Sequence, residues 1–293
     1  PIFILGDLRQ PGEDYAYEVL RLLQKNRVKN QLIFEIFSPA PADLMRQMSL
    51  SCPNFCLEIS PESHDPEVRK ASGRNYPNQD LEQTVSDALD AGCGRLDVFF
   101  MIGLPKQTPQ SVLDTIDYCE FLLQKFKGDK RLSLFIAPLS PFLDPGSLGF
   151  EQPERYGYRI LFRTLEEHRQ ALVAPSWKYS LNYETEWMTR QQIVDTAYEA
   201  ILRLNRLKAK YGITSKQMSE AGEQRIQAAS EMAHRIDEIL AKGNFQEELS
   251  RLKAEVDRIN AFPVSEKTQL ELPVGLIKLK PWRPLWSWAT GQW

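Results

Sequence analysis

The sequence predicts an α/β fold with a parallel sheet over residues 1–146, followed by a mainly helical region. Short, continuous apolar runs alternate there with segments of helical periodicity, and turn-forming residues separate them. Apolar runs without polar alternation are typical of strands in a parallel sheet. Alternating strands and helices indicate helical crossovers between parallel strands.

The first half supplies five predicted strands, over residues 2–5, 31–37, 55–60, 97–104 and 132–138. The first strand, Ile2 to Leu5, is entirely apolar, as expected of a strand that is covered on both faces. The third strand meets Pro61, which has no backbone N–H to donate. We therefore expect its ladder to end at Ser60.

Four helices are expected between these strands, over residues 13–25, 42–48, 80–91 and 108–126. The apolar stripe of the first helix consists of Tyr15, Val19, Leu22 and Leu23. Asp80 is expected to cap the third helix. Thr108-Pro109 opens the fourth, since it combines a capping hydroxyl with a proline at the first helical position.

The second half is predicted to be helical in three parts. We expect a helix over residues 154–172, an aromatic connector over 177–188, a helix over 189–211 and an antiparallel helical hairpin made of 226–240 and 245–259. The Pro- and Trp-rich tail could pack across the barrel or the hairpin, or bind a partner. The expected regions are 1–150, 151–212, 213–261 and 262–293.

Charge and hydropathy narrow the class of protein. The net charge of -3 and the pI near 5.8 argue against a large nucleic-acid partner, because phosphate binding normally needs clustered Lys and Arg. The longest apolar stretches have only strand length, so we expect no membrane-spanning segment. Few cysteines and no signal peptide before the first strand predict a cytoplasmic protein.

Cys52 and Cys56 have the spacing of half an iron–sulfur motif. The third cysteine that such a motif needs is missing, since Ile59 stands there. We therefore interpret Cys56 as a strand residue and predict no metal ligands in this sequence.

Loops at the predicted strand ends contain the residues of a candidate cofactor site. These residues are Gly6, Asp7, Ser60, Glu62, Ser63, Arg74, Ile102, Gly103, Leu104 and Pro105. Parallel α/β folds bind ligands at the carboxyl ends of their strands.

Taken in order, these motifs resemble those of the radical S-adenosylmethionine (SAM) superfamily, in the branch that often has an N-terminal cobalamin-binding domain. The resemblance covers residues 1–146 and implies a partial TIM-like (β/α)6 barrel. It implies that the turn at Gly6 contacts the methionyl amino group of SAM. It also implies that Glu62 binds the ribose hydroxyls, that Arg74 binds the methionyl carboxylate, and that the Gly103 loop lies beside the adenine.

The sequence departs from the family pattern at three places. Asp7 replaces a glutamate, and Phe99 stands where some relatives have an acidic ribose ligand. The Cys-x3-Cys-x2-Cys loop that holds the family's [4Fe–4S] cluster is also missing, and in the family it precedes the strand that begins this sequence. We therefore expect a fragment of a longer enzyme, with the cluster ligands upstream.

Two further carboxylates lie inside predicted strands, where burial without a partner would be costly. Alternation places Glu58 on the same face of its strand as Ser60. If Glu35 and Glu58 face the barrel interior, they are candidate contacts of SAM or of a Lys or Arg. For Glu35 a position at the rim remains an alternative. His64 could relay protons or belong to a cap-and-turn arrangement.

Two hypotheses of different class follow. In the first, the chain is the C-terminal part of a radical SAM enzyme and binds SAM. Together with a [4Fe–4S] loop, and in some relatives cobalamin, the whole enzyme would form a 5′-deoxyadenosyl radical. Its substrate would be a small molecule or a macromolecule. The second is a non-catalytic α/β scaffold that binds a protein partner through its helical hairpin and Trp-rich tail.

Overall fold

The computed structural model describes residues 1–52, 54–138 and 143–242. Within them the helices and strands are β1 (Ile2–Ile4), α1 (Glu13–Lys25), β2 (Leu32–Ile36), α2 (Ala42–Ser51), β3 (Cys56–Glu62), α3 (Pro66–Ala71), α4 (Asn78–Asp90), β4 (Arg95–Ile102), α5 (Pro109–Lys125), β5 (Leu132–Pro138), α6 (Leu148–Glu151), β6 (Tyr158–Ile160), α7 (Leu165–Leu172), β7 (Tyr183–Thr185), α8 (Arg190–Lys210) and α9 (Lys216–Lys242).

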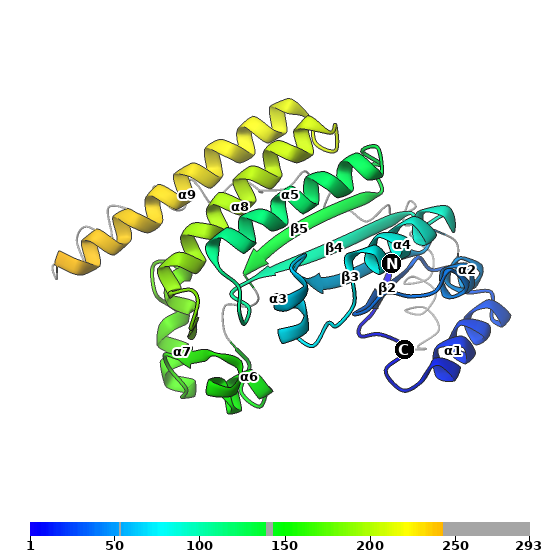
Figure 1. Ribbon diagram of the computed structural model, residues 1–293, viewed down its shortest axis with the longest axis horizontal. Coiled ribbons are helices and arrows are strands. Elements are labelled where there is room, and N and C mark those ends of the chain that lie inside the picture. Colours follow the sequence, from blue (N-terminus) through cyan, green and yellow to red (C-terminus); the bar gives the residue numbers. More distant parts are fainter. Residues whose placement is uncertain (53, 139–142, 243–293) are drawn as a thin grey trace, which may run out of the picture.

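The main sheet is parallel, and its strands follow one another in chain order from β1 to β5. In Figure 1, α1 and α2 lie toward the β1 end of the sheet, and α5, α8 and α9 lie along the β5 end. A parallel sheet in which each strand pairs with the next is the topology of an open, partial (β/α) barrel. The predicted α/β fold class is therefore confirmed.

The core lies between the sheet and its helices. Every second side chain of β4, from Leu96 to Ile102, is fully buried. Helix α5 packs Val112 and Ile116 into the same core. As predicted, the Thr108 hydroxyl accepts a hydrogen bond from the backbone N–H of Ser111 and so caps α5.

Two strands differ from the prediction. β1 is an edge strand within the described residues, and 47% of Ile2 and 42% of Phe3 are exposed, so it is not covered on both faces. β3 continues past Pro61 to Glu62. The register of β3 against β4 shifts between Ile59 and Glu62. This irregularity accommodates Pro61, because a proline has no backbone N–H to donate to the neighbouring strand.

Two helices in the first half differ from the prediction: α1 buries other residues than expected, and α4 begins at another residue. Beside the sheet edge, α1 buries Ala16 and Leu20 and leaves Tyr15 largely exposed. α4 begins at Asn78, with Pro77 at its N-cap position and no side-chain cap. The capping role predicted for Asp80 is wrong, because that residue already lies in the first helical turn.

The helix predicted over residues 154–172 is also wrong. Gly157, with φ +68°, ends a 3-10 turn over Pro153–Tyr156, because a left-handed backbone cannot continue a helix. β6 follows and pairs with β7 in an antiparallel ribbon, and only α7 is helical. By contrast, α8 begins at the predicted capping box of Thr189 and Gln192.

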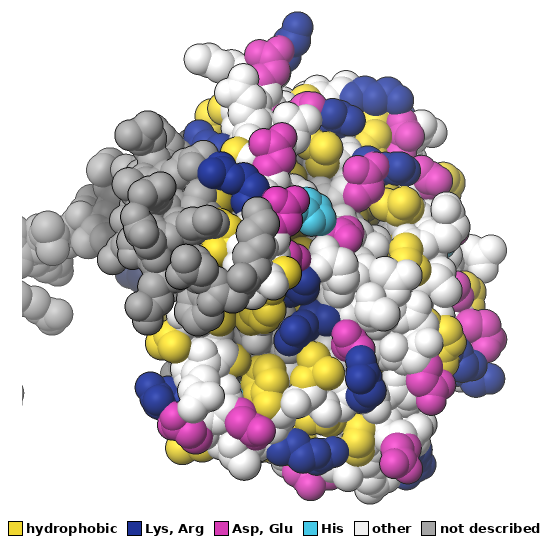
Figure 2. Space-filling view, turned by 90° about the vertical axis from the view of Figure 1, so that its left-hand side faces the viewer, with side chains coloured by type: hydrophobic (Ala, Val, Ile, Leu, Met, Phe, Trp, Pro, Cys, Tyr) yellow, Lys and Arg dark blue, Asp and Glu magenta, His cyan; other side chains and the backbone are white. Residues whose placement is uncertain are grey.

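α9 contains the first helix of the predicted hairpin and buries Ile226, Ala233 and Ile236. It packs against α8. The second helix of the hairpin, at 245–259, and the tail at 262–293 lie outside the described residues. No helix within the described residues is long and apolar enough to cross a membrane. On the face shown in Figure 2, basic and acidic side chains are interspersed.

Candidate functional site

Glu62 and Arg74 form an ion pair at the carboxyl edge of the sheet. Glu62 is the last residue of β3, and Arg74 lies in the loop between α3 and α4. Arg74 Nη2 is 3.2 Å from Glu62 Oε1, and only 13% of the Glu62 side chain is exposed. Burial raises the pKa of Glu62, although the Arg74 charge and hydrogen bond partly oppose it.

Each partner of this pair keeps one polar atom free. Glu62 Oε2 and Arg74 Nε are both buried and have no hydrogen-bond partner among the described residues. The hydroxyl of nearby Tyr76 is in the same condition. Because an unpaired buried polar group costs about 1–3 kcal/mol, such atoms indicate a site that a ligand can complete.

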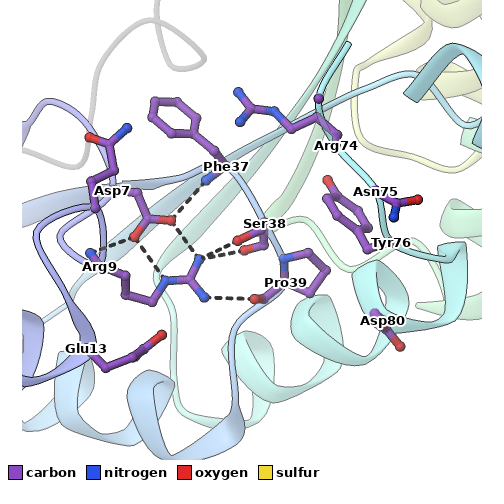
Figure 3. A pocket seen from close by; sticks show the side chains of 12 residues that line it. Asp7, Arg9, Glu13, Phe37, Ser38, Pro39, Arg74, Asn75, Tyr76 and Asp80 are labelled. Carbon is purple, nitrogen blue, oxygen red and sulfur yellow. Dashed lines mark hydrogen bonds and ion pairs between the residues drawn. The ribbon is translucent and has the colours of Figure 1, made fainter. Parts of the chain in front are cut away.

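A polar pocket of about 640 Å³ lies beside Arg74. As Figure 3 shows, one wall comes from the β1–α1 loop with Asp7 and Arg9, and the other from the α3–α4 loop with Arg74 and Tyr76. Phe37 lies between them, with its ring centroid 4.6 Å from the Arg74 guanidinium carbon. This volume falls in the range of small-molecule and cofactor sites.

Asp7 is already fully engaged. Its carboxylate accepts hydrogen bonds from Arg9 Nη2 at 2.6 Å and from the backbone N–H of Phe37 at 3.2 Å. Burial alone would raise the pKa of Asp7, but the hydrogen bonds of Arg9 and Phe37 lower it overall. In this conformation Asp7 therefore holds the turn in place and has little capacity left for a ligand amino group.

Three carboxylates lie in one row on the face of the sheet opposite the buried side chains of the core. Strand register aligns Glu35 on β2, Glu58 on β3 and Asp97 on β4. Glu35 accepts the backbone N–H of Gly6 at 2.5 Å. Burial, together with the charges of Glu35 and Asp97, raises the pKa of Glu58 to about 7. Both predicted strand carboxylates thus lie in the same row, and their proposed contact with SAM stays a prediction.

The Ile102-Gly103-Leu104-Pro105 loop is organised by Gln107. The Gln107 side chain accepts the backbone N–H of Gly103 at 2.8 Å and donates to Met101 O at 2.9 Å. Gly103 has φ +90°, and a Cβ there would lie 2.6 Å from the hydroxyl of fully buried Tyr183. Glycine is therefore required for a close approach, and the group that approaches in the structure is Tyr183.

The two serines of the β3 motif face inward. Ser60 and Ser63 are both buried, and Ser63 Oγ accepts the backbone N–H of Asp65. Asp65 caps α3 through the N–H groups of Glu67 and Val68, which confirms the cap-and-turn interpretation. His64 binds Thr115 Oγ1 at 2.9 Å through Nδ1, and burial lowers its pKa. The His64–Thr115 hydrogen bond joins this loop to α5.

The sequence-based reasoning missed Arg69 and Tyr76. Arg69 belongs to α3, a helix of six residues that shows no apolar periodicity, and it has no exposed surface. The Asp65-Pro66 pair could have predicted the start of α3, because it combines a capping carboxylate with a first-turn proline.

The cysteines do not fit an iron–sulfur cluster. All four are buried and free, and Cys56 lies in β3 as predicted. Burial raises the pKa of Cys56 to about 11 and those of Cys93 and Cys119 to about 12, which disfavours the thiolate form that binds metals. Within the described residues no group of three His, Cys, Asp or Glu side chains could hold a metal ion.

Neither a protein-family model nor a curated protein matches the sequence. Among solved structures, the chain is similar to the radical SAM methyltransferase TsrM from Kitasatospora setae. With cobalamin and a [4Fe–4S] cluster bound, TsrM shares 18% identity at a TM-score of 0.39, over 54% of this chain and 32% of TsrM. With tryptophan and aza-SAM bound, TsrM shares 19% identity at a TM-score of 0.34, over 40% of this chain and 24% of TsrM. The chain thus spans a third or less of the length of TsrM.

The chain is also similar to coproporphyrinogen III oxidase (HemN) from Escherichia coli, a radical SAM enzyme. Here the identity is 11% and the TM-score 0.36, over 76% of this chain and 68% of HemN. At these TM-scores the likeness is partial, so a function for this chain has to rest on the residues of its own site.

Proposed function

We propose that this chain binds SAM at the carboxyl edge of its parallel sheet, as part of a radical SAM enzyme. The supporting observation is the Glu62–Arg74 ion pair, in which each side chain keeps one buried polar atom without a partner in the described part of the chain; Arg74 also lines the 640 Å³ pocket. A zwitterionic nucleoside offers both the hydroxyl donors and the carboxylate that these two atoms require.

The residues present fit SAM in complementary ways. Glu62 Oε2 would accept hydrogen bonds from the ribose hydroxyls, and Arg74 Nε would donate to the methionyl carboxylate. The Arg74–Phe37 stacking fixes the plane of the guanidinium. When bound, SAM would supply a sulfonium carbon as the reactive centre. We also propose further contacts with SAM from Glu35, Glu58 and the Gly103 loop.

The same residues do not fit a [4Fe–4S] cluster, because the four buried cysteines are not assembled into a ligand group. Radical formation would therefore need cluster ligands from outside these 293 residues. By the same resemblance, a cobalamin-binding domain would also lie outside these 293 residues. With such a domain, methylation or a related rearrangement would be the reaction class.

Calorimetric titration of the 293-residue chain with SAM tests the proposal. We expect Glu62→Gln and Arg74→Met each to weaken SAM binding about tenfold or more, since each loses a buried charged hydrogen bond. Glu67→Gln and Arg46→Met are matched controls, because both side chains are largely exposed and lie in surface ion pairs. Unchanged affinity in both site variants would refute the assignment of the site.

A further inference from the structure

Arg69 is a fully buried arginine that hydrogen-bonds to two backbone carbonyls and one side chain. Its Nε donates to Ser63 O at 2.8 Å, and its Nη1 donates to Tyr76 O at 2.8 Å. Its Nη2 donates to the side chain of Asn78, the first residue of α4. The guanidinium also stacks on the Tyr76 ring, 4.8 Å from the centroid. One side chain thus ties the end of β3 to the start of α4.

Stability alone does not account for this residue. No ion pair with a carboxylate is formed by Arg69 in the part of the chain that the structure describes, and burial lowers its pKa. Buried charges are costly, and apolar side chains of similar volume often replace them without loss of stability. The three hydrogen bonds instead fix geometry, because the guanidinium is rigid and planar.

The segments that Arg69 joins hold the two halves of the candidate site. Ser63 directly follows Glu62, and the backbone N–H of Arg74 donates to Arg69 O at 2.9 Å. Tyr76, whose hydroxyl is buried, without a partner and beside the pocket, lies two residues further. Any displacement of Arg69 would therefore move Glu62 relative to Arg74 and Tyr76.

We propose that Arg69 is a positioning residue that sets the separation of Glu62 from Arg74 and Tyr76, and thereby the affinity for the carboxylate-bearing ligand. This inference rests on the proposed SAM site and goes beyond it, because Arg69 is fully buried and does not line the pocket. It also assigns the Tyr76 hydroxyl as a second hydrogen-bond donor, beside the Arg74 guanidinium, to the carboxylate of the ligand.

The test is SAM titration of the 293-residue chain with Arg69→Met. We expect affinity to fall about tenfold while the melting temperature changes by only a few degrees. Arg69→Lys should recover part of the loss, since an ammonium group can keep some of the carbonyl contacts. Arg131→Met is the control, because Arg131 also binds two backbone carbonyls, those of Leu89 and Cys93, but precedes β5 at the opposite edge of the sheet.

A double-mutant cycle separates positioning from a general structural effect. If Arg69 acts by positioning Arg74 among the other contacts, then Arg69→Met should weaken SAM binding less in the Arg74→Met background than in the parent chain. Additive losses would overturn the inference. If Arg69→Met does not fold, Asn78→Ala removes only the third contact, and an affinity equal to that of the parent chain would also overturn it.

The two proposals fail in different ways. Unchanged binding in both Glu62→Gln and Arg74→Met would refute the SAM site itself. Weaker binding in those two variants together with parental affinity in Arg69→Met would refute the positioning role alone.

Discussion

Glu62 combines three features that are each unfavourable for a free carboxylate. It is a non-glycine residue with φ +68°, its side chain is mostly buried, and one of its oxygens has no partner. A left-handed backbone at such a residue costs about 1–3 kcal/mol and is usually found where the surrounding structure enforces it. These costs support a functional role for Glu62, because an apolar residue would avoid two of them.

At the same scale, Glu58 should make stability depend on pH. Its pKa is raised to about 7, mainly by burial, so the folded chain binds its proton between about pH 4.5 and 7 while the unfolded chain releases it. The stabilisation is thus present at low pH and is lost as the pH rises through 7. Glu58→Gln should reduce this loss by about 1–2 kcal/mol in urea unfolding at pH 5 and pH 8.

The control for this measurement is Glu67→Gln, since Glu67 is exposed and pairs with Lys106 at the surface. A pH dependence in Glu58→Gln that equals the parental one would show that Glu58 does not titrate as described. Glu35 and Asp97 share the row, so the measured midpoint belongs to the three carboxylates together.

Among the elements, α3 is the one on which the site depends most. It begins at Pro66 and contains Arg69, and the loop after it holds Arg74. Asp65 caps it by accepting the backbone N–H groups of Glu67 and Val68. Helices of six residues are not stable by themselves, so the cap and the buried Arg69 must keep α3 in place.

Asp65→Ala should therefore affect stability and binding together. Loss of an N-cap costs about 1 kcal/mol, and we expect SAM affinity to fall severalfold because the α3 segment loosens. Thr189→Ala removes a comparable cap from α8 and should cost similar stability without an effect on SAM binding. Equal SAM affinity in the two variants would show that the α3 cap has no part in the site.

Elements with strong local signals were predictable from the sequence. Thr108-Pro109 and the periodic apolar residues of α5 define that helix. The motifs assigned Glu62 and Arg74 to one site, and the structure places the two side chains in contact, while their contacts with SAM stay a prediction. The region around Gly157 was not predictable, because its ribbon forms only through pairing with β7, far along the chain. Likewise, the engagement of Asp7 by Arg9 depends on side-chain contacts that no spacing reveals.

For the molecule as a whole, we expect the chain to bind SAM at its sheet but not to hold an iron–sulfur cluster through its cysteines. The carboxyl edge of the sheet holds the candidate site, whereas Cys52, Cys56, Cys93 and Cys119 are buried, free thiols, and no metal-holding group of side chains occurs among the described residues. Anaerobic reconstitution of the 293 residues with iron and sulfide should therefore yield no stable four-iron species, as measured by iron content and visible absorbance. About four irons retained per chain would contradict this view and would restore Cys52 and Cys56 as ligands.

The central claim is that Arg74 binds the carboxylate of SAM, and a ligand lacking that group tests it most directly. SAM and decarboxylated SAM should be titrated into the parent chain and into Arg74→Met. We predict that Arg74→Met weakens SAM binding about tenfold but changes binding of decarboxylated SAM less than about twofold, because only the former loses a partner. An equal loss for both ligands would contradict the account.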